Sequence, residues 1–307
     1  MTPARVAFVG SGPFGVETLR RLTASPSVEL VGIVTAPPRP AGRSREPKPT
    51  PIAIAARAMW IPILTPDRLR APESVAEVLA LRPDLLVLAD YGQIVPPALL
   101  DLPHGALNLH PSLLPRHRGA SPIQAAILAG DRETGVTLMR MDAGLDTGPI
   151  VAVERVTLDG TETAPELERR LAILGADLLE RSLEPWIRGD LPATPQPSEG
   201  ATVTTPLRRD HGRLDASRPA AELERQVRAY QPWPGSWLKT NVGRLVVWSA
   251  EAAPADGGKP GEIVADADGI ALLTAEGRLR LVEVQPAGGG RMSGAAFRRG
   301  RPAIVSA

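Results

Sequence analysis

Short apolar runs alternate with helical patterns over the first half of the chain. Strands are predicted at 5–10, 29–35, 84–89 and 106–109, and helices at 16–23, 72–81 and 122–129. Short apolar strands between amphipathic helices are typical of a mostly parallel sheet that is covered on both faces. The sequence therefore predicts an α/β, Rossmann-like domain, which would bind ligands at the carboxyl ends of its strands.

A second domain of different character is predicted beyond residue 206. Residues 164–189 predict a long helix, and the Pro-rich stretch 190–206 has little apolar periodicity, as in a linker. A helix is expected at 220–229, and strands at 235–250, 261–265, 270–274 and 278–285. Such strands indicate a small β-barrel or sandwich. We expect domains at 1–189 and 207–307, joined by a linker at 190–206.

Composition narrows the possible chemistry. The chain has 307 residues, 43% of them apolar, which is enough for a substantial core. It has no Cys and only four His, so thiol catalysis is excluded and no metal site is expected. Neither a membrane-spanning run nor a leader peptide is evident, and we expect a cytoplasmic monomer. Residues 207–307 carry 15 Lys and Arg against 11 Asp and Glu, whereas residues 1–206 carry 20 against 23. This asymmetry is either ordinary surface variation or the mark of a polyanionic partner.

Three polar residues follow apolar runs. Asn108 and His110 point the same way in an extended segment, and Asp146 lies in a Gly-rich turn after the strand predicted at 135–141. Each alone is more typical of a structural role, Asp146 as a turn former. Together they provide an amide donor, a base and a carboxylate, which suit transfer at a carbonyl carbon. The α/β pattern is expected to place both motifs at the same edge of the sheet.

Two other motifs are weaker. Residues 10–15 match the dinucleotide fingerprint G-x-G-x-x-G, but Thr35 stands where the ribose-binding acid is required, and Pro13 removes a backbone donor. A tight strand–helix turn is the better interpretation than an NAD-dependent enzyme. The triplet 146–148 resembles that of aspartic proteases, which need two carboxylates on an all-β scaffold.

A family resemblance is carried by much longer matches. Residues 108–124 (NLHPSLLPRHRGASPIQ) and 142–149 (DAGLDTGP) resemble the signature of the 10-formyltetrahydrofolate-dependent formyltransferases. Segments 39–43, 49–51, 91–96, 231–237 and 285–288 resemble the members that act on methionyl-tRNA. Three places depart from the family pattern: the Gly10–Pro13 turn, Asp90 where a small residue is usual, and the weakly basic stretch 44–47.

The resemblance implies a formyl transfer from 10-formyltetrahydrofolate to the α-amine of initiator methionyl-tRNA, with an oligonucleotide-binding (OB-like) barrel as the second domain. His110 and Asp146 would remove a proton from the amine, with Asp146 holding the useful imidazole tautomer, and Asn108 and protonated His110 would stabilise the oxyanion. The folate would contact Tyr91, Gly92, Gln93, Ile94, Val95, Ser112, Leu113, Leu114, Pro115, Met141, Asp142 and Gly144. The tRNA would contact Arg39, Arg43, Arg45 and Lys48. Two alternatives stay open, a formyltransferase acting on an amino-sugar nucleotide and a non-catalytic folate- or RNA-binding protein.

Overall fold

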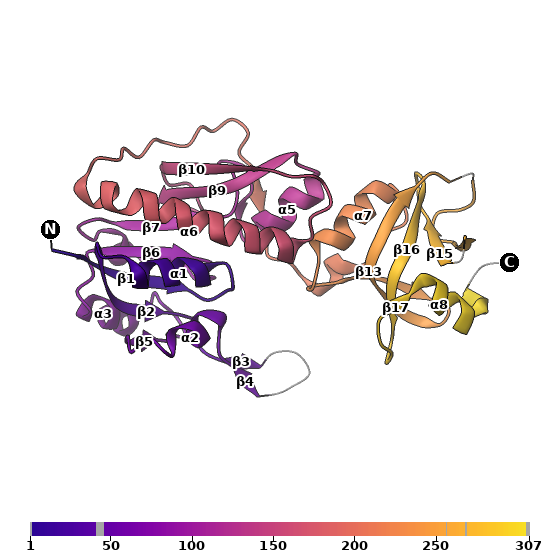
Figure 1. Cartoon of the computed structure of the whole chain (residues 1–307), viewed down its shortest axis with the longest axis horizontal. Coiled ribbons are helices and arrows are strands. Elements are labelled where there is room, and N and C mark those ends of the chain that lie inside the picture. The colour runs from indigo at the N-terminus through magenta and orange to yellow at the C-terminus, as the bar shows by residue number, and fades with distance from the viewer. Residues whose placement is uncertain (1, 41–45, 256, 268, 305–307) are drawn as a thin grey trace. The chain divides into compact units, whose positions relative to one another are not determined.

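The computed structural model describes residues 2–40, 46–255, 257–267 and 269–304, and the chain divides into two compact units (Figure 1). The first unit consists of residues 1–122, 133–157 and 168–204. The second consists of residues 205–307 together with 123–132 and 158–167.

A seven-stranded sheet forms the centre of the first unit, with strand order β10-β9-β7-β6-β1-β2-β5. The strands are β1 (Ala4–Gly10), β2 (Val28–Val34), β5 (Ile63–Leu64), β6 (Leu85–Ala89), β7 (Ala106–His110), β9 (Glu133–Arg140) and β10 (Ile150–Thr157). The five strands from β7 to β5 are parallel to one another, whereas β9 is antiparallel to both of its neighbours, β7 and β10. The predicted Rossmann-like, mostly parallel sheet is therefore confirmed.

Helices cover the sheet of the first unit. They are α1 (Gly15–Ala24), α2 (Pro51–Ala56), α3 (Pro72–Ala80), α4 (Pro97–Leu100), and α6 (Ala164–Arg188), of which residues from 168 onward belong to this unit. Apolar residues of β1, β2 and β6 pack with Val78 of α3 and Leu99 of α4 in one buried cluster. In Figure 1, α1 and α6 lie in front of the strands. Burial of the sheet on both sides explains its uninterrupted apolar runs.

The direction of β9 corrects one expectation. β9 pairs antiparallel with β7, so that Arg140 at its carboxyl end lies opposite Leu107 near the amino end of β7. The sequence predicts that the loop at 141–149 leaves the sheet at the same edge as His110. This prediction is wrong, because the loop begins at the opposite edge. It returns along β7 instead. Residues 111–132, which include α5 (Pro122–Ala129), connect the two strands.

Antiparallel strands dominate the second unit, as expected. Their order is β12-β13-β16-β15-β14, with β17 beside β16. Their bounds are β12 (Ser236–Thr240), β13 (Gly243–Ala253), β14 (Ile263–Asp266), β15 (Gly269–Leu273), β16 (Arg278–Pro286) and β17 (Met292–Ser293). Helices α7 (Ala220–Ala229) and α8 (Gly294–Gly300) bury Leu223 and Phe297 in the same core. The single strand predicted at 235–250 was wrong, because a turn at Asn241–Val242 divides it.

Two short pairs of strands complete the fold. β3 (Arg39–Pro40) and β4 (Pro47–Lys48) form a hairpin, and β8 (Arg118–Gly119) pairs with β11 (Val203–Thr204). Within the described ranges, none of the helices combines the length and the apolar character needed to cross a membrane.

Candidate active site

β7 presents Asn108 and His110 on one face, since side chains two residues apart on a strand point the same way. The neighbouring Leu107 and Leu109 are buried on the other face. Asn108 is half-buried, whereas His110 is only 4% exposed. The apolar positions of the strand thus fix the direction of its two polar side chains.

Asp146 reaches these residues from the loop at 141–149. Asn108 Nδ2 lies 3.5 Å from Asp146 Oδ1, and the backbone N–H of Gly119 donates to Asp146 Oδ2 at 2.8 Å. The same Oδ2 lies 3.7 Å from His110 Nδ1. The structure therefore brings together the amide, imidazole and carboxylate that the sequence analysis selected.

A backbone carbonyl sets the tautomer of His110. His110 Nε2 lies 2.8 Å from the carbonyl oxygen of His117, which can only accept, so Nε2 must carry a proton. Neutral His110 therefore has its free electron pair on Nδ1, facing Asp146. The sequence analysis gave this tautomer-setting role to Asp146. The structure gives it to His117, because Asp146 approaches the opposite nitrogen.

Burial lowers the pKa of His110, and the negative charge of Asp146 and the His117 carbonyl oppose this effect. His110 is thus held as a neutral base at physiological pH. When Nδ1 takes up a proton, the imidazolium meets the carboxylate 3.7 Å away. Two acceptors that face each other across this gap suit a substrate group that arrives with hydrogens, such as an amine.

The residues predicted to contact folate fall into two groups. Tyr91, Val95 and Met141 pack against the same apolar cluster, which brings the 91–95 and 141–145 loops to one region. Ile94 and Leu145 on these loops are 73% and 61% exposed. The Tyr91 hydroxyl is buried without a hydrogen-bond partner among the described residues, and burial raises the pKa of Tyr91 to about 12. Exposed apolar side chains beside an unpaired hydroxyl fit a flat, partly polar ligand.

The other predicted folate residues have local structural contacts. Gln93 bonds the backbone at Leu69 and Pro66, and Asp142 accepts from Gly144 N and Thr147 Oγ1. Ser112 Oγ donates to the Arg116 carbonyl at 2.6 Å, and Leu114 N donates to Thr137 Oγ1. These side chains shape the loops. The backbone carbonyls of Leu113 and Pro115 accept from Arg116 N and Thr202 N, and the space beside Gly92 is open.

The basic hairpin is partly described. Arg39 and Lys48 are exposed and lie directly opposite each other in the β3–β4 pair. Arg43 and Arg45 lie outside the described residues. Like charges directly opposite on neighbouring strands repel, and a bound polyanion would relieve this repulsion.

Asp90 acts on a second carboxyl group, that of Glu168, which the sequence patterns did not single out. Asp90 follows β6 with a left-handed φ of 58°, and a Cβ at Gly12 would overlap its carboxyl group. The two departures from the family pattern are thus neighbours, because a side chain at position 12 would have to displace the Asp90 carboxyl group. Loss of surrounding water raises the pKa of Asp90. Burial and the charge of Asp90 raise the pKa of Glu168 on α6 to about 7. Among the described residues, no three His, Cys, Asp or Glu converge as a metal site would require.

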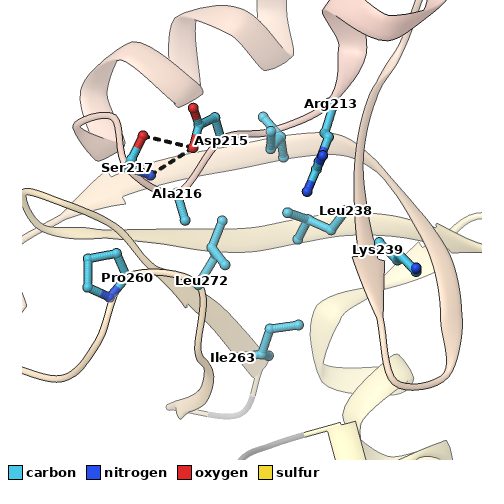
Figure 2. A pocket seen from close by; sticks show the side chains of 11 residues that line it. Arg213, Asp215, Ala216, Ser217, Leu238, Lys239, Pro260, Ile263 and Leu272 are labelled. Atoms are coloured by element: carbon cyan, nitrogen blue, oxygen red, sulfur yellow. Dashed lines mark hydrogen bonds between the residues drawn. The ribbon is translucent and has the colours of Figure 1, made fainter.

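A cavity of about 690 Å³ lies in the second unit, between β12 and the β14–β15 pair. Leu214, Leu238, Ile263 and Leu272 form its apolar lining, and Figure 2 shows Arg213 and Lys239 among the side chains around it. The side chain and backbone N–H of Ser217 donate to Asp215 Oδ1. The cavity thus combines an apolar floor with a polar rim.

The chain was compared with known proteins. The family model "Formyl transferase" matches residues 4–183, and "Formyl transferase, C-terminal domain" matches residues 206–302. The chain belongs to the formyltransferase family. A methionyl-tRNA formyltransferase from Roseiflexus sp. (strain RS-1) is 44% identical over 306 residues, covering 97% of this chain and 93% of the relative. One from Methylobacterium sp. (strain 4-46) is 44% identical over 302 residues, covering 97% and 96%.

Solved structures share the formyltransferase fold. The N-formyltransferase from Helicobacter canadensis, in complex with folinic acid and dTDP-3-aminofucose, superposes with a TM-score of 0.65 at 15% identity. The superposition covers 90% of this chain and 98% of that one. At this identity the likeness concerns the fold alone.

Proposed function

We propose that this formyltransferase transfers the formyl group of 10-formyltetrahydrofolate to the α-amine of initiator methionyl-tRNA, for translation initiation. The observation that carries the proposal is the convergence of Asn108, His110 and Asp146 within hydrogen-bonding or ion-pairing distance. The acceptor is supported by the methionyl-tRNA formyltransferases that align with nearly the whole chain.

The proposed chemistry follows from the tautomer of His110. The attacking amine must be neutral, and an α-amine has a pKa of roughly 8, so one proton must leave. Nδ1 of His110 is the acceptor that can take it, and Asp146 stabilises the resulting imidazolium. A bond forms between the amine nitrogen and the formyl carbon, the bond from that carbon to N10 breaks, and N10 takes up the second proton, which the attacking nitrogen loses after attack. Asn108 Nδ2 would donate to the developing oxyanion, since both ring nitrogens of His110 already face His117 and Asp146.

The donor is proposed to lie against the 91–95 and 141–145 loops. Exposed Ile94 and Leu145 would provide apolar contact, and the Tyr91 hydroxyl would gain a hydrogen-bond partner. Ser112, Leu113, Leu114 and Pro115 would support the site from beside His110.

The second unit is proposed to bind the tRNA backbone. Lys239 and Arg244 lie directly opposite each other on β12 and β13, both exposed, and Arg244 lies over the Trp237 ring at 4.4 Å. No carboxylate in the described part of the chain lies within 4.0 Å of either cation. Their repulsion would be relieved by phosphates, which basic side chains bind without reading sequence. Arg39, Arg43, Arg45 and Lys48 would contact the same tRNA.

We also propose the division into a catalytic domain at 1–189, a linker at 190–206 and a tRNA-binding domain at 207–307. A monomer in the cytoplasm is proposed with this function, since initiator tRNA is charged and used there. Sedimentation of the purified protein tests the monomer.

The deciding experiment measures labelled formyl transfer to charged initiator tRNA, charged elongator tRNA and an amino-sugar nucleotide. We expect transfer to initiator methionyl-tRNA. Transfer to the amino-sugar nucleotide alone would establish the alternative acceptor, and transfer to none would leave the binding-protein alternative.

A further inference from the structure

The two residues whose oxygens face the nitrogens of the His110 ring have left-handed backbones. His117, whose carbonyl faces Nε2, has a φ of 57°, and Asp146, whose carboxylate faces Nδ1, has a φ of 51°. Residues other than glycine keep this conformation only where surrounding contacts hold them in place. The contacts that hold these two residues therefore determine where the partners of the ring lie.

Residues 194–204, here called the strap, supply such contacts on both sides of the ring. Gln196 Nε2 donates to the carbonyls of Asp146 at 2.8 Å and Gly148 at 2.7 Å. On the other side, His117 N donates to Thr202 Oγ1 at 2.8 Å. β11 of the strap also pairs with β8, immediately after His117. The strap lies within the segment that the sequence predicts to be a linker.

The amide of Gln196 is fully used by these contacts. Its nitrogen donates to two carbonyls, and its oxygen accepts from Arg118 Nε at 3.1 Å and Nη2 at 2.7 Å. Among side chains, only the amides of Asn and Gln combine two N–H donors with a carbonyl acceptor. Gln196 therefore connects the Asp146 turn to Arg118, the residue after His117.

We propose that Gln196 is a positioning residue for the transfer, because its amide holds the Asp146 turn at the distance from His110 Nδ1 that proton removal requires. The inference rests on the proposed formyl transfer and extends it to a residue outside the reacting groups. The strap would then position the reacting groups as well as connect the two units.

The proposal distinguishes donated hydrogen bonds from space filling. In Gln196→Glu the side chain keeps its length and its acceptor for Arg118, but it loses both N–H groups. If Gln196 merely filled space or paired with Arg118, Glu would preserve turnover. Because the donors are what matter here, we expect kcat to fall roughly a hundredfold, the scale of an ångström-sized misplacement. The KM for 10-formyltetrahydrofolate should change much less.

A second measurement follows the proton acceptor. The charged and titratable groups recorded as acting on His110 are Asp146, which raises its pKa, and His117, which lowers it. Gln196→Ala adds no charge and releases the Asp146 turn. The pKa of His110 should then fall further, and the acid limb of the kcat–pH profile should move to lower pH. A role in stability alone would leave this limb in place.

Glu199→Gln is the matched control, since Glu199 is an exposed residue of the same strap whose side chain makes no hydrogen bond or ion pair with the described residues. It should retain wild-type kcat. Three results would each overturn the proposal: wild-type kcat in Gln196→Ala, wild-type kcat in Gln196→Glu, or an unmoved acid limb in Gln196→Ala. If Gln196→Ala does not fold, the kcat of Gln196→Glu decides. Failure of the proposed function differs, since the wild-type protein would then not formylate initiator methionyl-tRNA.

Discussion

Replacing Asp146 by Asn isolates the charge that faces His110. Asn is nearly the same size and keeps an oxygen that can accept from Gly119 N, so the turn should persist. What disappears is the negative charge 3.7 Å from Nδ1. Loss of this charge lowers the pKa of His110, because it removes the largest influence that opposes burial.

The separation of 3.7 Å between these atoms sets the magnitude. Coulomb's law gives about 4 kcal/mol for unit charges at this distance with an effective dielectric constant near 20, and about 1 kcal/mol in bulk water. Since the imidazolium forms only after proton transfer, this energy stabilises the later stages of the reaction. We therefore expect kcat to fall between roughly tenfold and a thousandfold. The buried position of His110 favours the upper part of this range.

Two assays check this expectation. The first is the pH dependence of kcat for formylation of charged initiator tRNA, and the second is the NMR titration of His110 in the free protein. Asp101→Asn is a suitable control, because Asp101 is exposed at the end of α4 and its side chain makes no hydrogen bond or ion pair with the described residues. A raised or unchanged pKa of His110, or a kcat within twofold of wild type, would refute the reasoning.

Three further expectations follow from the same geometry. Asn108→Ala should lower kcat roughly a hundredfold by removing one oxyanion donor, measured in single-turnover transfer; near-normal turnover would remove Asn108 from the site. Glu168→Gln should raise the melting temperature at pH 8 by about 2–4 °C and should have little effect at pH 5. The raised pKa of the Glu168 carboxyl destabilises the folded protein as pH rises from about 4.5 to 7. This cost is about 1 kcal/mol once it is discounted for partial exposure of the side chain. Lys239→Ala and Arg244→Ala should each raise the KM for tRNA and reduce the salt dependence of tRNA binding by about one phosphate contact, with kcat unchanged; an unchanged salt slope would contradict the proposed contact.

Much of the fold could be predicted because apolar periodicity is a local property. The runs at β1, β2 and β6 are buried on both faces, so their composition alone indicates a central parallel sheet. β10 was missed because its burial is only partial, which leaves no continuous apolar run. β9 pairs antiparallel with β7, and the apolar pattern of the β9 residues is the same for either direction.

The reacting groups could be selected from sequence, but their roles could not. Asn108, His110 and Asp146 are polar residues that follow apolar runs, and all three lie in the motifs that resemble the formyltransferase signature. The His117 carbonyl is a backbone atom that any residue would provide, and what distinguishes it is a left-handed φ that only the structure reveals. From the sequence, the role of fixing the His110 tautomer was therefore given to the Asp146 carboxylate, because a carboxylate side chain can be recognised in the sequence and a backbone carbonyl cannot.

The strap shows why a linker composition is an incomplete guide. Pro195 and Pro197 flank Gln196 and exclude a helix, and proline-rich segments without apolar periodicity are usually spacers. The same rigidity also suits an extended segment that must present one amide to two carbonyls in a fixed direction, since fewer backbone states are lost on ordering. Thr194 pairs with Ile150 before Gln196, and Thr202 and Thr204 bond the 117–121 segment after it. Polar residues spaced between prolines are thus compatible with a linker and equally with an anchored strand, and only their hydrogen-bond partners distinguish the two.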